Sequence, residues 1–161
     1  MNRKTPMPSA SKTVAAAPGL DDFLCFATYS ANLAFGRAYK PVLDALGLTS
    51  YTQFIAIVAL SEEDNQSVGG LGEKLFLESN TLTPILKKLE VLGYLTRRRD
   101  PADERQVIVS LTPEGRSVRE RAHALNLRAA TGLGDDFAKV QQAVVRLRDN
   151  LLRSVAEKAR K

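Results

Sequence analysis

The sequence predicts a mainly α-helical fold with a small β-hairpin, and three observations carry this prediction. Apolar residues at helical spacing mark a short helix from Val68 and a second helix from Ser79, with a turn between them. After Gly93, two β-rich runs, YLTRRR and RQVIVSL, are joined by the turn-forming segment DPADE. Long amphipathic segments flank this stretch on both sides. A helix pair followed by a hairpin with arginines at its tip is the layout of a winged helix-turn-helix.

The composition is that of a globular chain of single-domain size. Of the 161 residues, 44% are hydrophobic and 25% are charged, and the formal net charge is +5. Such a positive charge permits nucleic-acid binding without proving it. The lone cysteine cannot form an intramolecular disulfide, and no apolar run approaches the length of a membrane helix or the core of a signal peptide. We therefore expect a cytoplasmic protein without a membrane partner, with a flexible tail over residues 1–18 and one domain over 19–161.

A long first helix is predicted from Leu20, with Asp21 and Asp22 in its first turn near the positive end of the helix dipole. Small and apolar residues recur along one face at a 4-3-4-3-4-3 spacing: Leu20, Leu24, Ala27, Ala31, Ala34, Ala38 and Pro41. The alanines allow another helix to approach closely. Residues 20–46 are therefore predicted to be a dimerisation helix, and the alternative is burial within the same subunit.

The next segment, residues 50–115, is predicted to be the winged helix-turn-helix lobe. Gly47 ends the first helix, and Ser50 is a candidate N-cap for a helix over residues 51–60. In the helix that begins at Val68, three glycines lower the helix propensity, so packing must hold it together. These glycines are Gly69, Gly70 and Gly72.

The second helix of the pair has clearer boundaries. Ser79 is its candidate N-cap and Gly93 its C-terminal stop, and Pro84 falls near the end of the first turn. Its apolar residues follow a 3-1-3-3 sequence spacing that makes one continuous face: Leu82, Ile85, Leu86, Leu89 and Leu92.

The last third of the chain, residues 116–160, is predicted to supply the other part of a dimerisation layer. Thr112-Pro-Glu-Gly opens a helix, because threonine is a good N-cap and proline is favoured in the first turn. Further on, one amphipathic face is formed by Phe137, Val140, Val144, Leu147, Leu151 and Val155.

The second helix of such a pair enters the DNA major groove, so its polar residues are candidate contacts with double-stranded DNA. Asn80, Thr81 and Thr83 lie at the end expected to meet base edges. Ser79, Lys87 and Lys88 are better placed for phosphates, although ordinary helix solvation is the alternative for the two lysines. A two-fold dimer would bind a pseudo-palindromic operator with half-site centres about one helical turn apart.

The hairpin carries four further candidate DNA contacts, Arg97, Arg98, Arg99 and Arg105. An arginine at a hairpin tip suits a narrow A·T-rich minor groove, where the potential is most negative. We expect Arg105 to make this contact and Asp103 to orient it through an ion pair. The alternative for these arginines is a solvated hairpin tip.

Several of these segments together resemble one known family. LCFATYS, GRAYKPVLDALGLT and LGEKLFLESNTLTPILKKLEVLGYLTRRRDPADERQVIVSLTPEG, within residues 20–118, resemble the multiple-antibiotic-resistance regulator (MarR) family. The first two segments carry the narrower likeness, to its organic-hydroperoxide-resistance regulators (OhrR). The resemblance implies a dimeric winged-helix repressor with a single N-terminal cysteine, which organic peroxides oxidise so that the DNA is released. By this resemblance Cys25 is the sensor and Tyr39 and Tyr51 bind its reduced sulfur.

Tyr29 also matches the subgroup pattern, four residues after Cys25 on the same helix face. Tyr39 is fourteen residues from Cys25, which is about 21 Å along a helix. Tyr39 therefore reaches the sulfur only across an antiparallel helix pair in a homodimer. The chain departs from the subgroup in the segment LTSYTQ, which is one residue longer before Tyr51, and in the glycines at 69 and 70.

A chain with one cysteine has no second protein thiol to resolve a sulfenic acid. We therefore expect a small thiol to form a mixed disulfide with Cys25, or further oxidation to sulfinic acid. Without the family resemblance, Cys25 would be interpreted as a small buried hydrophobic residue.

Three other functions fit parts of the sequence. One is a MarR-type repressor released by a small phenolic or acidic ligand, with an inert Cys25. Another is a thiol enzyme, but the only histidine, His123, lies far along the chain as an ordinary helical residue. One cysteine and one histidine also provide no metal set, so we expect no metal, no cofactor and no enzyme activity. The third is a winged helix that contacts only proteins, against which the arginine-rich hairpin argues.

Overall fold

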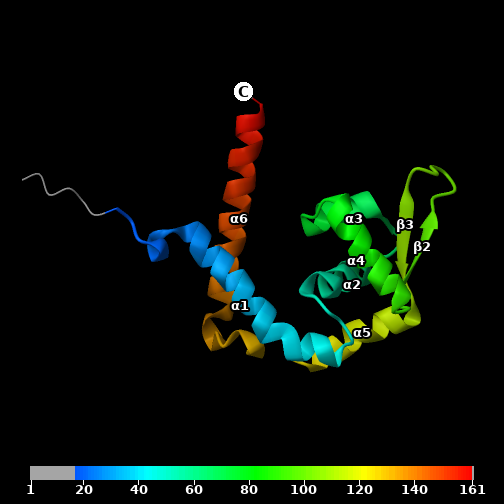
Figure 1. Ribbon diagram of the computed structural model, residues 1–161, viewed down its shortest axis with the longest axis horizontal. Coiled ribbons are helices and arrows are strands. Elements are labelled where there is room, and N and C mark those ends of the chain that lie inside the picture. The colour runs from blue at the N-terminus through cyan, green and yellow to red at the C-terminus, as the bar shows by residue number, and fades with distance from the viewer. Residues whose placement is uncertain (1–16, 161) are drawn as a thin grey trace, which may run out of the picture. The chain divides into compact units, whose positions relative to one another are not determined.

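The computed structural model describes residues 17–160. Its compact units divide the chain within the first long helix, into Met1–Leu33 and Ala34–Lys161. The predicted tail, residues 1–18, lies outside the described residues except for its last two positions. No helix among residues 17–160 is long and apolar enough to span a bilayer. The described residues are mainly helical with one small sheet, in agreement with the predicted fold class (Figure 1).

The first unit begins with a 3₁₀ turn, η1 (Leu20–Asp22), and continues into α1 (Leu24–Ala45). A single helix from Leu20 was the expectation, and it is wrong at this point. The Asp22 carboxylate accepts a hydrogen bond from the Gly19 backbone N–H at 2.8 Å, which closes the turn. Phe23 then adopts an extended conformation with ψ 114°, so the turn and α1 are separate elements.

The second unit contains the end of α1 and all the remaining elements. Its helices and 3₁₀ turns are α2 (Tyr51–Glu62), α3 (Val68–Leu75), α4 (Ser79–Val91), α5 (Pro113–Ala124), η2 (Ala129–Thr131), η3 (Gly134–Asp136) and α6 (Phe137–Ala159).

Two of the predicted helix caps are present and one is displaced. The Ser50 hydroxyl accepts from the Gln53 backbone N–H at 3.3 Å, and Thr112 caps α5 in the same way. Ser79, however, is the first residue of α4, and Glu78 occupies the N-cap position. The tight turn after α3 explains the shift, because the Glu78 carbonyl already accepts from the Leu82 N–H at 3.0 Å and begins the helical hydrogen-bond pattern.

The sheet has three antiparallel strands in the order β1-β3-β2, formed by β1 (Gln66–Ser67), β2 (Leu95–Arg99) and β3 (Val107–Leu111). The hairpin of β2 and β3 is the predicted wing, and its register pairs Arg97 with Val109. The short β1 was not predicted, since two residues are too few to show an alternating pattern. Asp64, just before β1, accepts from the Leu111 backbone N–H at 2.9 Å and forms an ion pair with Arg116. These bonds join β3 and α5 to the segment before α3.

A core of aliphatic side chains holds α2 to α5 and the sheet together. Its fully buried members include Ile57, Leu60, Leu71, Leu82, Leu86, Leu89, Val109 and Val118. Packing therefore supports the glycine-rich α3, as the sequence predicts. Gly72 is required there, because a Cβ at this position would lie 2.7 Å from the Leu77 carbonyl oxygen.

Candidate nucleic-acid interface

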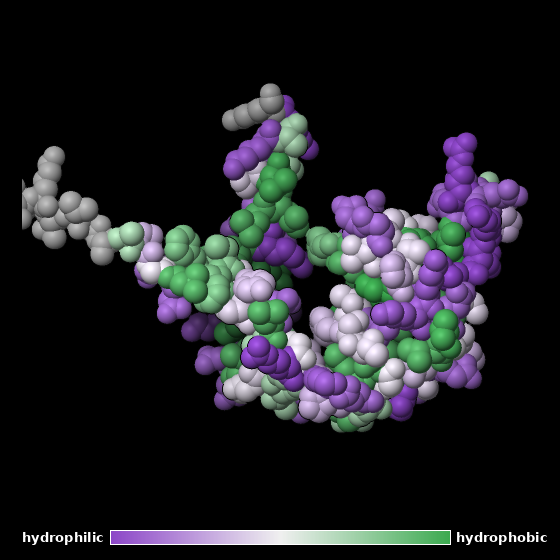
Figure 2. All heavy atoms as spheres, viewed as in Figure 1, coloured by the Kyte–Doolittle hydropathy of each residue, from purple (hydrophilic) through white to green (hydrophobic). Residues whose placement is uncertain are grey.

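A hollow of about 420 Å³ separates the N-terminal part of α4 from the wing. Serine, threonine, glutamine and arginine side chains supply its polar lining: Ser67, Ser79, Thr83, Arg97, Arg105 and Gln106. Hydrophilic residues gather over the wing in Figure 2. The serine, threonine and arginine residues in this lining carry groups that donate hydrogen bonds to phosphate oxygens, so the hollow suits part of a polyanion.

The lining residues of α4 share one face of that helix. Ser79, Thr83 and Leu86 line the hollow at positions i, i+4 and i+7. The Thr83 hydroxyl donates to the Ser79 carbonyl oxygen at 2.7 Å, which fixes the Thr83 rotamer. Asn80 and Thr81 are exposed at the start of α4 but do not line the hollow.

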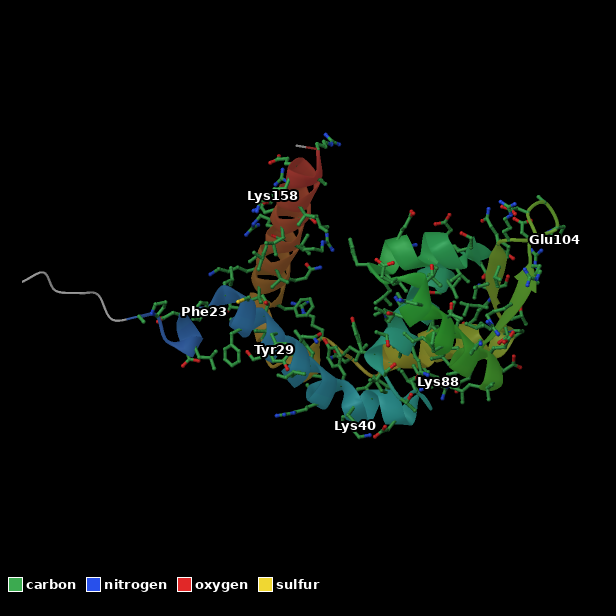
Figure 3. All side chains as sticks on the ribbon, turned by 45° about the horizontal axis from the view of Figure 1, so that its top comes forward. Phe23, Tyr29, Lys40, Lys88, Glu104 and Lys158 are labelled. Carbon is green, nitrogen blue, oxygen red and sulfur yellow. The ribbon has the colours of Figure 1, made fainter. Side chains whose placement is uncertain are left out.

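Neither of the two predicted lysine contacts on α4 lines the hollow. Lys87 and Lys88 are both exposed, and Lys88 lies about 140° around the helix axis from Thr83. Figure 3 shows the Lys88 side chain directed outward from the helix. Lys88 and Thr83 therefore belong to different faces of α4.

The sheet register separates the three consecutive arginines, which the sequence treats alike. Arg97 follows the buried Leu95 by two residues, so both point to the inner face of the sheet. Arg98 points to the opposite face, and Arg99 donates to the Glu104 carbonyl oxygen at 2.6 Å near the wing tip, where Figure 3 labels Glu104.

Arg97 is the most constrained of the three. The Glu90 carboxylate accepts from Arg97 Nε at 2.9 Å and from Arg97 Nη2 at 2.6 Å through the same oxygen. Its other oxygen accepts from the Arg97 backbone N–H at 3.2 Å. The Arg97 side chain is 22% exposed, so α4 and β2 are joined by a largely covered ion pair.

Arg105 and Asp103 are related differently from the expectation. Asp103 accepts from the Arg105 backbone N–H at 3.1 Å and from Gln106 Nε2 at 3.2 Å. Over the described residues no ion pair joins Asp103 to the Arg105 guanidinium, so the expected orientation by an ion pair is wrong. The carboxylate instead closes the turn of the wing, as aspartate commonly does by bonding backbone N–H groups two residues ahead.

The four candidate sensor residues fall in both compact units. Cys25 and Tyr29 lie on the first part of α1, where Cys25 is exposed and Tyr29 is 60% exposed. The Thr28 hydroxyl donates to the Cys25 carbonyl oxygen at 2.9 Å. Within the first unit, the cysteine is therefore accessible rather than a small core residue.

Tyr39 and Tyr51 pack together in the second unit, with ring centroids 5.5 Å apart. Phe35 extends this aromatic cluster beyond Tyr39, and Phe54 extends it beyond Tyr51. The additional residue before Tyr51 has not separated the two tyrosines, because Ser50 caps α2 and Tyr51 begins it. Burial raises the pKa of both phenols above 10.0, and the neighbouring Tyr51 raises the pKa of Tyr39 further. Both phenols are thus neutral hydrogen-bond donors at physiological pH.

Comparison with known proteins gives the family. A family model described as transcriptional regulator SarA/Rot matches residues 37–121. The organic hydroperoxide resistance transcriptional regulator of Bacillus subtilis is 37% identical over 135 residues, which are 82% of this chain and 91% of that protein. The chain belongs to the MarR family. Within it, this regulator is of the organic-hydroperoxide-resistance type, as the resemblance in the sequence indicates.

Two further proteins are similar to this chain. The HTH-type transcriptional regulator TtmR of Methylorubrum extorquens is 48% identical over 106 residues, and the match spans 66% of this chain but only 54% of TtmR. Among solved structures, reduced AbfR bound to DNA superposes with a TM-score of 0.69 and 31% identity, covering 84% of this chain and 96% of AbfR. AbfR is a protein of Staphylococcus epidermidis.

Three residues of the hollow and its border, Ser67, Gln106 and Glu90, were not predicted from the sequence of this MarR-family chain. Ser67 caps α3 by accepting from the Gly70 N–H at 3.0 Å, and the Ser-x-x-Gly spacing was a usable signal. Glu90 had no such signal, because the sheet register determines which of the three arginines faces it. No group of three metal-ligating side chains occurs within residues 17–160.

Proposed function

We propose that this regulator is a DNA-binding repressor that releases its operator when an organic hydroperoxide oxidises Cys25. The observation that carries the DNA-binding part is the hollow between α4 and the wing, with Arg97 and Arg105 among its lining residues. Membership of the organic-hydroperoxide-resistance subgroup supports the sensing part. In this proposal the regulator acts in the cytoplasm, where its DNA lies.

The DNA-binding surface in this proposal combines base and phosphate contacts. Residues at the start of α4 meet base edges in the major groove, while hydroxyls and arginines around the hollow contact phosphates. Arg105 extends from the wing toward the minor groove. The DNA-bound form of AbfR, a relative of similar fold, supports double-stranded DNA as the partner.

The chemistry begins with the Cys25 thiolate as nucleophile. Its sulfur attacks one oxygen of the hydroperoxide, so that an S–O bond forms and the O–O bond breaks. The sulfur loses two electrons and becomes a sulfenic acid, and the departing alkoxide takes a proton to become an alcohol. A small thiol then condenses with the sulfenic acid, forming a disulfide and releasing water.

The tyrosines are proposed to stabilise the reduced sulfur in a homodimer. Phenol O–H donors directed at a sulfur favour the thiolate, which is the form that attacks peroxide. Tyr39 and Tyr51 retain their protons, because burial raises the pKa of each. In a two-fold dimer, the phenols of one subunit approach Cys25 of the other. Tyr29, four residues from Cys25 on α1, lies on the same helix face as the sulfur.

The exposed apolar residues of the two terminal helices support the homodimer. On α6, Val144 is 53% exposed and Leu151 is 58% exposed, while Leu24 on α1 is 62% exposed. Figure 2 shows hydrophobic residues along α6 and on the first part of α1. Apolar surface of this extent commonly marks a protein interface.

A substitution of the sulfur tests the sensing part of the proposal. Cys25→Ser should bind operator DNA like the wild type and remain bound at hydroperoxide concentrations that release the wild type, as measured by fluorescence anisotropy. Asn32→Ala, an exposed change on the same helix, serves as the matched control and should still release DNA. Release of DNA by the serine variant would contradict the proposal.

A substitution on the wing tests the DNA-binding part. Arg105→Ala should weaken operator binding at least tenfold, because the wing loses its contact with the minor groove. Lys40→Ala, which removes an exposed charge paired with Asp44 on α1, should leave the affinity within about twofold. Unchanged affinity of the arginine variant at moderate salt would contradict the wing assignment.

A further inference from the structure

The pairing of Glu90 with Arg97 places beside the hollow a cation that is already neutralised. A free arginine on a phosphate-binding surface adds affinity, because each phosphate that it neutralises releases counterions. Arg97 is instead held by Glu90 through three hydrogen bonds of 2.6, 2.9 and 3.2 Å. The carboxylate comes from the last turn of α4, and the arginine comes from β2 of the wing.

The position of Glu90 on α4 makes this pairing part of the proposed DNA surface. Glu90 follows Thr83 by seven residues and Ser79 by eleven, so all three lie on one face of the helix. That face forms one wall of the hollow, and Arg97 is part of the lining. On the wing, the register places Arg97 opposite the fully buried Val109. The guanidinium is thus held between the core and the cavity.

The remaining hydrogen-bond capacity of Arg97 is limited and directional. A guanidinium has five N–H donors in a fixed plane, and Nε and one N–H of Nη2 are committed to Glu90. The other donors remain in that plane, which is held by two guanidinium N–H groups that share one Glu90 oxygen. The Arg97 guanidinium can therefore direct a hydrogen bond to DNA, although Arg97 and Glu90 together carry no net charge.

We propose that Glu90 is a positioning residue for DNA recognition, which fixes the wing to α4 through Arg97 and removes one full cation from the phosphate-binding surface. This inference rests on the proposed DNA-binding function. It adds that DNA contact by Arg97, in the lining of the hollow, depends on geometry more than on charge. Glu90 thereby weakens the electrostatic attraction for DNA of any sequence, so that the protein favours operator DNA over random-sequence DNA.

The salt dependence of DNA binding tests this role, because a purely structural role would not change it. Each additional phosphate neutralised by a cation steepens the plot of log affinity against log salt by about 0.9. Glu90→Gln keeps the size of the side chain and removes its charge, so Arg97 becomes a full cation. The slope should steepen by about 0.9 for each subunit, or about 1.8 for a dimer. The ratio of operator to random-sequence affinity should fall severalfold.

The double variant Glu90→Gln, Arg97→Gln is the matched control. It restores the net charge of the wild-type pair, so its slope should equal that of the wild type even where its affinity is lower. It also keeps the inference testable if the single variant is poorly folded by circular dichroism. A double-variant slope shallower by about 0.9 per subunit would show that Arg97 counts as a free cation in the wild type, and would overturn the inference.

The outcomes separate this inference from the function on which it rests. A wild type that binds operator with a steep salt slope, together with an unchanged slope for Glu90→Gln, overturns the role of Glu90 alone. A wild type without salt-dependent DNA binding overturns the proposed function and this inference together.

Discussion

The helices α4 and α6 have the same kind of apolar spacing and opposite degrees of burial. In α4, Leu82, Leu86 and Leu89 are completely buried. In α6, none of the 23 residues is buried, although Val144, Leu151 and Val155 also follow a helical period. The apolar face of α4 therefore packs within the chain, whereas that of α6 remains without a complete covering among the described residues. An amphipathic pattern specifies which face will be buried, and other parts of the molecule decide what buries it.

The largest expected effect comes from a substitution in the buried core that α4 and α5 share. A Cβ at Gly115 would lie 1.9 Å from the Tyr94 carbonyl oxygen, a distance that no side chain adjustment relieves. Gly115→Ala should therefore prevent cooperative folding of the lobe, seen as loss of a thermal transition by circular dichroism.

The matched control is a glycine in open space. At Gly69, the nearest atom to an added Cβ is Ser67 Oγ at 4.0 Å. Gly69→Ala should therefore stabilise the protein by roughly 0.4–1 kcal/mol, because the unfolded chain loses freedom. Normal melting of the Gly115 variant would show that the lobe is less tightly packed than its contacts indicate.

The second-largest expected effect concerns the exposed apolar face of α6. Leu151→Asp places a charge in the proposed dimer contact, so the protein should become monomeric and lose at least tenfold in operator affinity, because only one half-site is engaged. Light scattering coupled to gel filtration measures the change. Gln142→Asp, on the opposite side of α6 and also exposed, should remain dimeric. A dimeric Leu151 variant would show that this face is not the contact.

The smallest effect concerns the half-buried tyrosine cluster, whose burial is intermediate between that of the apolar face of α4 and that of α6. Because burial raises the pKa of Tyr39 and Tyr51 above 10.0 in the folded state, the unfolded chain releases these protons first. The free energy of unfolding should therefore decrease as the pH rises above 10.

A phenylalanine variant isolates this contribution. Tyr51→Phe should reduce the decrease at high pH, measured by urea unfolding at pH 8 and at pH 10.5, relative to a Tyr29→Phe control with an exposed ring. An equal decrease in both variants would assign the pH dependence to other groups.

The α4 and wing region was well predicted from the sequence, because local signals determine it. The leucine period, Gly93 and Thr112 mark element boundaries that depend on neighbouring residues alone. Local signals are insufficient where the environment of one residue depends on a distant one. Arg97 resembles Arg98 and Arg99 in the sequence, but the sheet register turns it inward to Glu90.

The sensor region shows a different limit. The family motifs predict Cys25 and the tyrosines as sensor residues, whereas the packing of Tyr39 against Tyr51 has no local signal because they belong to different helices. The residue that ends η1, Asp22, was assigned to a helix because carboxylates are common in first turns. Its hydrogen bond back to Gly19 stabilises a separate turn instead.

The most direct test of the central claim is a reversible binding titration of the wild-type protein on the DNA upstream of its own coding region. Fluorescence anisotropy would compare reduced protein, protein treated with an organic hydroperoxide, and the treated protein after dithiothreitol. The proposed function predicts tight binding, release, and recovery of binding in that order. Binding that persists unchanged through peroxide treatment would contradict it, and would favour a MarR-family regulator controlled by a small ligand.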